Sequence, residues 1–191
     1  MNAYTINFNP VFNMTDEQFY QLCQLNPDVK FERNAMGELL IVSPTGGETG
    51  RYNAGLIADF VFWNRQTQLG EVFDSSTCFK LPGNGNRSPD VAWVKKERWD
   101  ALTLEQKKKF PPIAPDFVLE LMSPTGTLRE TQAKMQEYMD SGVKLAWLID
   151  PEARRVEIYR SQQQVEILEV PETISGEDVL LGFSLSLKTI W

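Results

Sequence analysis

The segment Pro115–Met122 constrains the fold most, because it places one carboxylate inside an otherwise apolar strand. The sequence there reads PDFVLELM. With a period of two, Val118, Glu120 and Met122 share one face of the strand, and the opposite face is apolar throughout. A strand that is apolar on both faces is typical of a sheet covered on both sides. Glu120 therefore requires a cation, a metal ion or hydrogen-bond donors, because an uncompensated buried carboxylate costs several kcal/mol.

The amino-acid composition excludes several classes of function. The 191 residues suffice for one well-cored domain and contain no histidine. This excludes Ser-His-Asp and Cys-His catalysis and histidine-ligated zinc. Catalysis would have to use carboxylates, lysine and Mg²⁺ or Mn²⁺ held through oxygen. The net charge of −7 argues against a protein that coats nucleic acid nonspecifically, because that affinity comes from lysine and arginine.

The low number of cysteines and the lack of long apolar segments lead us to expect a cytoplasmic protein. Cys23 and Cys78 are too few and too far apart for a disulfide framework or a zinc site. A reducing cytoplasm is the natural compartment for such a chain. The N-terminal residues lack the basic and apolar regions of a secretory signal, and no apolar run reaches the roughly 20 residues of a membrane span.

The order of predicted elements indicates an α/β fold: a mixed β-sheet flanked by helices, with extra antiparallel strands near both termini. We expect one domain over 1–191, with a core at about 40–151, an N-terminal helix and hairpin at 14–43 and a C-terminal β-meander at 154–191. The first predicted elements are a helix at 14–25 capped by Thr15, a hairpin at 29–44 and a helix that opens at Thr45–Glu48 and ends at Gly70. They are followed by a strand at about 71–81, a strand from Asp90, a helical segment at 96–110 and the strand of Glu120. The last are a helix at about 127–141 stopped by Gly142, a strand at 144–150 and solvent-facing strands within 154–170. The last dozen residues are expected to pack back on the body.

Lys134 lies on the helix that follows the strand of Glu120. The apolar stripe of this helix consists of Leu128, Thr131, Met135, Tyr138 and Met139. At 100° per residue, Lys134 lies beside Tyr138 on the flank of the stripe, whereas Arg129, Gln136, Glu137 and Asp140 point away. Its methylenes would follow the sheet, and its ammonium would reach toward Glu120. The alternative is an ordinary surface lysine.

Three further acids have competing interpretations. Asp90 opens an apolar strand in SPDVAWV, where it is either a functional carboxylate or ordinary Pro-Asp turn chemistry. Asp116 has the same context at the start of its strand, and we interpret it as a structural cap. Glu48 follows Thr45 by three residues, so a capping box explains it as well as function does.

The candidate residues suit phosphodiester hydrolysis if they converge. Asp90 and Glu120 would hold one hard divalent cation, with Glu48 as a supplementary ligand, directly or through water. Lys134 would orient the attacking water or stabilise the transition state. Phosphate contacts would come from nearby cations, each of which is otherwise a solvated surface charge: Lys80, Arg87 and Arg51.

The pattern resembles the core of the PD-(D/E)XK nuclease superfamily and, more narrowly, the Uma-type family of bacterial proteins named putative restriction endonucleases. The stretches that carry the resemblance are SPTGGETGR, RSPDVAWV, PDFVLELMSPT, the Lys134 segment and GVKLAWLIDP, within about 40–151. The resemblance implies a restriction-endonuclease-like fold, Mg²⁺ dependence and DNA as substrate. It assigns Asp90 and Glu120 as metal ligands and Glu48 as the helix acid. The superfamily lysine usually follows the acid by two residues, where this chain has Met122, so Lys134 would replace it.

Two other functions remain open. The first is a catalytically inactive nuclease-fold module that binds DNA or supports assembly. The second is an oligomerisation domain that buries Val156, Ile158, Tyr159 and Ile167 between subunits. For a nuclease that cuts both strands, analogy favours a homodimer, because two-fold symmetry presents two sites to a duplex.

Overall fold

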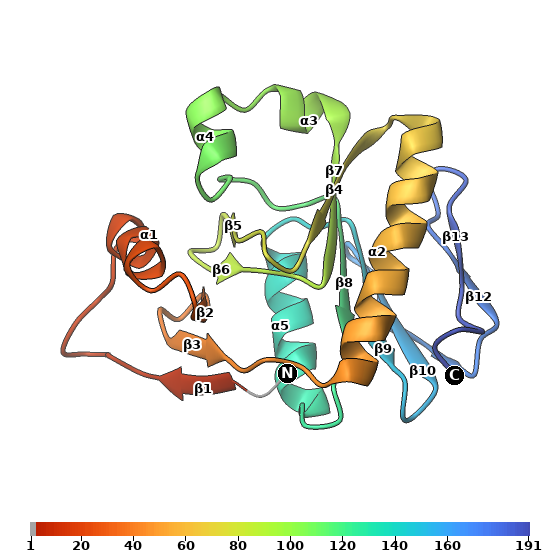
Figure 1. Ribbon diagram of the computed structural model, residues 1–191, viewed down its shortest axis with the longest axis horizontal. Coiled ribbons are helices and arrows are strands. Elements are labelled where there is room, and N and C mark those ends of the chain that lie inside the picture. Colours follow the sequence, from red (N-terminus) through yellow and green to blue (C-terminus); the bar gives the residue numbers. More distant parts are fainter. Residues whose placement is uncertain (1–2) are drawn as a thin grey trace.

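The strand of Glu120 lies inside a six-stranded mixed sheet, as its two apolar faces require (Figure 1). The structure is a computed structural model that describes residues 3–191. The order along the sheet is β11 (Glu166–Glu169), β10 (Arg155–Arg160), β9 (Leu145–Asp150), β8 (Phe117–Leu121), β7 (Val91–Lys95) and β4 (Gly70–Asp74). Strands β8 and β9 are parallel, and the other neighbours are antiparallel. This confirms the predicted mixed α/β architecture.

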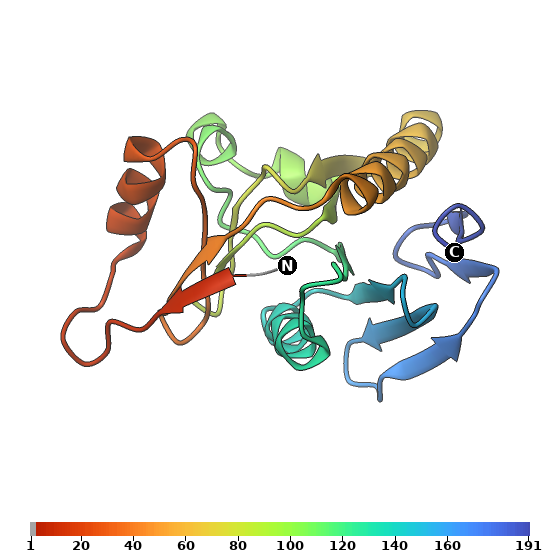
Figure 2. The ribbon, with the colours of Figure 1, turned by 60° about the horizontal axis from the view of Figure 1, so that its bottom comes forward.

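Each face of this sheet is covered by a different helix (Figure 2). Helix α2 (Gly47–Thr67) covers one face together with the C-terminal hairpin of β12 (Thr173–Ser175) and β13 (Ser184–Ser186). Helix α5 (Leu128–Asp140) covers the other face through Met135 and Tyr138. The period-two interpretation of β8 holds, because Phe117 packs on the α2 side and Val118 on the α5 side. Glu120 therefore points toward α5.

A second, five-stranded antiparallel sheet lies beside α5 (Figure 1). Its order is β1 (Ala3–Ile6), β3 (Leu39–Val42), β2 (Lys30–Arg33), β6 (Asn86–Arg87) and β5 (Phe79–Lys80). The predicted hairpin at 29–44 is confirmed as β2 and β3. Helix α1 (Asp16–Leu25) packs on this sheet through the buried Phe19, and Thr15 caps it in a reciprocal capping box with Gln18.

Several predicted boundaries were wrong for local reasons. The single strand expected at 71–81 is divided between β4 and β5, which belong to different sheets. The segment 96–110 contains two short helices, α3 (Lys96–Asp100) and α4 (Leu104–Lys108), because Thr103 caps the second. Helix α2 begins after Gly46 without a side-chain cap, so the capping box at Thr45–Glu48 does not form. It ends before Gly70, at Thr67, with Gln68 in a left-handed conformation.

The C-terminal region is more buried than a solvent-facing meander. Strand β10 is buried on both faces, and only its neighbour β11 is largely exposed. Val156, Ile158 and Tyr159 belong to the cores of the chain itself, and Ile167 alone of the predicted patch is exposed. These residues therefore do not support the oligomerisation interpretation. The last residues do pack back on the body, through Leu180, Phe183, Leu185 and Leu187.

None of the helices between residues 3 and 191 combines the length and the apolar character needed to cross a bilayer.

Candidate active site

Asp90 and Glu120 face each other across the β7–β8 pair. Val91 lies opposite Leu119, so the register continued by one residue sets Asp90 opposite Glu120. The Asp90 side chain accepts a hydrogen bond through Oδ2 from the Leu121 backbone N–H at 2.9 Å. Both carboxylates are 3% exposed and lie on the α5 side of the sheet. The Pro-Asp segment thus presents a buried acid to the second acid.

Helix α5 supplies two donors to Glu120. The Lys134 ammonium lies 2.8 Å from Glu120 Oε1, and the Tyr138 hydroxyl donates to the same oxygen at 2.8 Å. The two donors are four residues apart and therefore share one side of the helix. The helical spacing left two interpretations of Lys134 open, and the ammonium lies against Glu120 rather than at the open surface.

Glu32 completes the cluster from the second sheet, and sequence reasoning missed it. Its Oε1 lies 3.1 Å from Lys134 Nζ and accepts the Ser88 backbone N–H at 3.2 Å. Its Oε2 accepts from Arg87 at 3.0 Å. The carboxylate is 2% exposed. Alternation in Lys30-Phe31-Glu32 is typical of the solvent face of a hairpin, so only the packing of the two sheets reveals this acid.

Arg87 is held inside the structure. It lies between Glu32 and Glu137, and two of its nitrogens contact Glu137 at 3.1 and 2.5 Å. Its exposed fraction is 5%. With its guanidinium engaged by two carboxylates, we do not propose it as a phosphate contact. Glu137 was expected to point away from the apolar stripe of α5; it pairs with Arg87 of the second sheet, where its side chain is largely buried.

Helix α2 reaches Asp90 through an amide. The Asn53 side chain donates to Asp90 Oδ1 at 3.3 Å. Glu48 lies exposed in the first turn of α2, where it accepts a hydrogen bond from Tyr52 at 3.2 Å. A direct role for Glu48 in metal binding therefore stays a prediction that this arrangement does not support.

The other predicted cations lie on the surface. Lys80 pairs with Asp16 at 2.5 Å, on the α1 side of the second sheet. The exposed Arg51 stacks over the ring of Tyr52, 4.5 Å from its centroid.

Asp116 is a structural residue, as predicted. It accepts the Lys95 backbone N–H at 2.9 Å and pairs with Arg98 at 2.8 Å and with Lys144 at 2.7 Å. These contacts fasten the start of β8 to its neighbours.

The four charged groups of the cluster have strongly shifted pKa values. Burial raises the pKa of Asp90, and burial together with the Asp90 charge raises that of Glu120 despite Lys134. Burial would also raise the pKa of Glu32, but Lys134 and Arg87 outweigh it and hold this pKa at about 2. Burial opposes the charge of Lys134, yet Glu120 and Glu32 raise its pKa above the usual value. Lys134 therefore stays protonated at neutral pH.

The donor set fits a hard divalent cation. No group of three His, Cys, Asp or Glu side chains within residues 3–191 is arranged to hold a metal. Mg²⁺ does not need one, because it is commonly held by one or two carboxylates and several waters. Glu120 Oε2 receives no hydrogen bond from the described part of the chain, and Asp90 Oδ1 receives only the long one from Asn53. Burial raises the pKa of both acids, because the charged carboxylate loses its hydration, and a bound cation would offset that loss.

A cavity of about 600 Å³ adjoins this cluster and is open to solvent. Glu32 lines it together with Leu40 and Val42 of the neighbouring strand β3, and Glu120 and Lys134 line it as well. Glu32, Glu120 and Lys134 thus border an open cavity although their side chains are buried, whereas Asp90 is not part of the lining.

Comparison with known proteins supports a nuclease-like fold. The profile of the Uma2 family, described as "Putative restriction endonuclease", matches residues 16–188. A crystal structure of a putative nuclease belonging to DUF820 from Anabaena variabilis superimposes with a TM-score of 0.71 at 19% identity. The match covers 84% of this chain and 88% of that one. A search of curated proteins found no match.

Proposed function

The chain belongs to the Uma2 family, and we propose that it is a metal-dependent endonuclease that hydrolyses DNA phosphodiester bonds. One observation carries this proposal: Asp90, Glu120 and Lys134 come from three separate elements and form one buried cluster beside an open cavity. Two carboxylates can hold a divalent cation, and a lysine can stabilise the negative charge of a phosphodiester in the transition state. The family supports the reaction class, and the geometry supports the residues.

Each residue has a separate role in the proposed reaction. Asp90 and Glu120 would hold Mg²⁺ or Mn²⁺ through Oδ1 and Oε2, the oxygens with the fewest partners. A cation bound there would lower the pKa of a water molecule and offset charge on the leaving oxygen. Lys134 would stabilise negative charge on the phosphate, because an ammonium with a raised pKa is a poor general base.

We propose that Lys134 replaces the lysine that the superfamily usually has two residues after the acid, where this chain has Met122. Met122 follows β8 and packs with the apolar cluster on the α5 side of the sheet. The Lys134 ammonium, at 2.8 Å from Glu120, supplies a cation in direct contact with the second acid. This contact supports the replacement.

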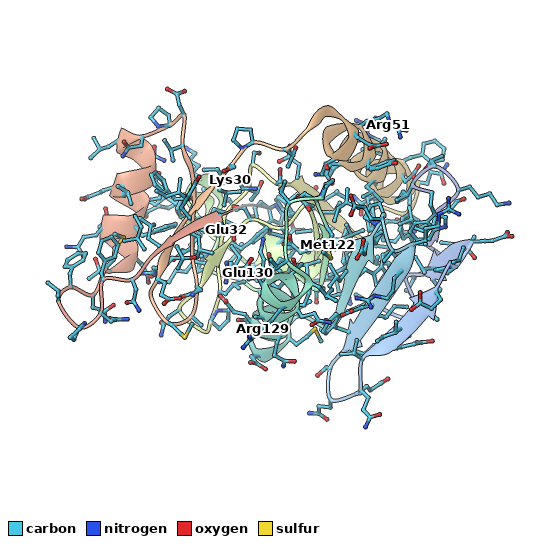
Figure 3. All side chains as sticks on the ribbon, turned by 90° about the horizontal axis from the view of Figure 1, so that it is seen from below. Lys30, Glu32, Arg51, Met122, Arg129 and Glu130 are labelled. Carbon is cyan, nitrogen blue, oxygen red and sulfur yellow. The ribbon has the colours of Figure 1, made fainter. Side chains whose placement is uncertain are left out.

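We propose that DNA approaches the face shown in Figure 3. Lys30 of β2, Arg51 of α2 and Arg129 of α5 are all seen in this view, on three elements that border the site, together with Glu32 and Glu130. None of the three forms an ion pair with a carboxylate of residues 3–191, although most of the other cations near the site do. Unpaired cations on three elements would contact phosphates on either side of the reacting one.

A second candidate function has its own supporting observation. Lys134 and Arg87 already neutralise much of the buried charge without a metal ion. A nuclease-fold module that binds DNA or supports assembly without cleavage would retain such a cluster for stability alone.

Cleavage assays on matched variants separate the two functions. Supercoiled, linear and single-stranded DNA would be incubated with Mg²⁺ or Mn²⁺ and with the wild type, Asp90→Asn, Glu120→Gln or Lys134→Met. We expect each substitution to lower cleavage by about 10²-fold or more. Glu157→Gln is the control, because this buried carboxylate lies outside the cluster. Metal-dependent cleavage that survives in Glu120→Gln would refute the proposed site.

Cleavage of both strands would be favoured by two symmetry-related sites, and we propose a homodimer for that reason. Sedimentation of the free protein and of its DNA complex measures this. A complex with one chain per duplex that still cuts both strands would contradict it.

A further inference from the structure

Glu32 is a buried carboxylate to which the proposed chemistry assigns no role. It comes from β2 in the second sheet, whereas Asp90 and Glu120 belong to the six-stranded sheet. On the basis of the proposed function, we infer that Glu32 is a positioning residue, which fixes the Lys134 ammonium so that its remaining N–H faces the reacting phosphate.

The inference follows from the hydrogen-bonding capacity of an ammonium. Lys134 has three N–H donors and no acceptor. The ammonium forms an ion pair with Glu120 Oε1 at 2.8 Å and donates a hydrogen bond to Glu32 Oε1 at 3.1 Å. Two acceptors on different sheets prevent the ammonium from rotating, so the third donor has a defined direction. A donor whose direction is set before the reaction stabilises developing charge without reorganisation.

Glu32 is itself held by donors that are independent of the lysine. Arg87 contacts its Oε2 at 3.0 Å, and the Ser88 backbone N–H contacts its Oε1 at 3.2 Å. These two residues lie just before Asp90 in the chain. The segment that ends at Asp90, a proposed metal ligand, therefore also fixes Glu32, which contacts Lys134.

Glu32 also keeps Lys134 in place while Glu120 binds a cation. Lys134 and Tyr138 both donate to Glu120 Oε1, so a cation on the other oxygen would weaken this acceptor by drawing its charge. Glu32 is not one of the two proposed ligands of the cation, so its Oε1 would continue to accept from the ammonium.

The alternative is that Glu32 has a purely structural role: it holds Arg87 within the second sheet, and Arg87 in turn fastens that sheet to α5 through Glu137. Glu137→Gln tests this alternative, because it removes the other carboxylate of Arg87 and leaves both acceptors of Lys134 intact. Glu157→Gln controls for loss of a buried glutamate. A purely structural role predicts similar defects in Glu32→Gln and Glu137→Gln.

The first measurement uses the metal-free and Mg²⁺-loaded full chain and does not depend on cleavage. Lysine ammonium resonances are recorded by ¹H–¹⁵N NMR, and Lys134→Met assigns the signal of Lys134. We expect a slowly exchanging signal in the wild type, Glu137→Gln and Glu157→Gln, and its loss in Glu32→Gln. A signal that persists in Glu32→Gln with Mg²⁺ bound would overturn the inference, even if the wild type cleaves no DNA.

The second measurement is steady-state cleavage at saturating Mg²⁺. We expect Glu32→Gln to lower kcat by roughly 10- to 100-fold with KM for DNA unchanged, because a misdirected catalytic group costs up to about 10²-fold. Glu32→Asp, which keeps the charge, should restore part of kcat. An equal loss in Glu137→Gln, or a loss confined to KM, would overturn the inference.

Discussion

Among single residues, two buried glutamates on the same sheet differ in the number of donors around them, and this difference distinguishes a structural carboxylate from a candidate ligand. Glu157 on β10 has donors on both oxygens, from Gln132, Tyr159 and Arg155. Glu120 has donors on one oxygen only, and its pKa is raised by burial. A saturated carboxylate is a structural group, whereas one with an open oxygen and a raised pKa is available to a cation.

Glu120→Gln should weaken Mn²⁺ binding at least about tenfold, because it removes one of two charged ligands. Its stability without metal at neutral pH should stay the same or rise. The raised pKa means that the folded state holds a proton more readily than the unfolded chain, so ionisation above that pKa opposes folding. Calorimetric titration and urea unfolding measure the two effects. Equally weakened Mn²⁺ binding in Glu157→Gln would contradict this prediction, because it would show that loss of any buried glutamate lowers the affinity.

Ionised Glu32 should stabilise the folded protein, whereas ionised Glu120 opposes folding, so the two residues should change the stability in acid in opposite directions. Its pKa in the folded protein is about 2, below the ordinary value of 4.5. The resulting stability is fully present above pH 4.5 and is lost as the pH falls toward 2. The free energy of unfolding of wild type and Glu32→Gln, measured against pH, should therefore differ most near neutrality and converge in acid. Parallel curves would contradict this assignment.

Among the elements, α5 organises the site because three of its residues bind three different partners. Lys134 contacts Glu120 and Glu32, Glu137 contacts Arg87, and Tyr138 contacts Glu120. The helix thereby connects the six-stranded sheet to the five-stranded one. Its charged residues are spaced so that one helix serves both sheets.

Asp116 fastens the start of strand β8, and its replacement should affect stability without affecting cleavage. Asp116→Ala removes acceptors for Lys95 N–H, Arg98 and Lys144 and should cost about 1–3 kcal/mol of unfolding free energy. Because both cationic partners remain partly exposed, no buried charge is stranded. Cleavage per folded molecule should be unchanged, as measured at a temperature where the variant is folded. A selective loss of cleavage would place Asp116 in the site.

For the molecule as a whole, an acidic chain presents unpaired cations around one face. The net charge is −7, yet Lys30, Arg51 and Arg129 of three different elements are all seen in the view of Figure 3. Such a distribution would limit DNA binding to this face and make it sensitive to salt.

Replacement of Lys30, Arg51 and Arg129 by glutamine should weaken DNA binding. The slope of log affinity against log salt should fall by roughly one for each phosphate that the variant no longer binds. The matched control removes the same charge elsewhere, at the exposed Arg65, Lys108 and Arg154. Fluorescence anisotropy at several salt concentrations measures both. Equal weakening by the two sets would show that net charge, rather than this face, determines binding.

The local directions of the main site residues could be predicted from the order of amino acids alone. Alternation placed Glu120 on one face of a buried strand, and helical spacing placed Lys134 beside Tyr138 on the helix that covers it. Both are consequences of backbone geometry, which repeats along the chain whatever surrounds it.

Which charges meet depends instead on how the chain packs in three dimensions. Glu32 and Arg87 have the sequence pattern of surface residues on short strands, and Glu48 has that of a candidate ligand. The packing of the second sheet against α5 buries the first two, and the start of α2 leaves the third exposed. Burial and ion pairing between residues more than fifty positions apart are set by the packing of sheets and helices, and no local period in the sequence encodes that.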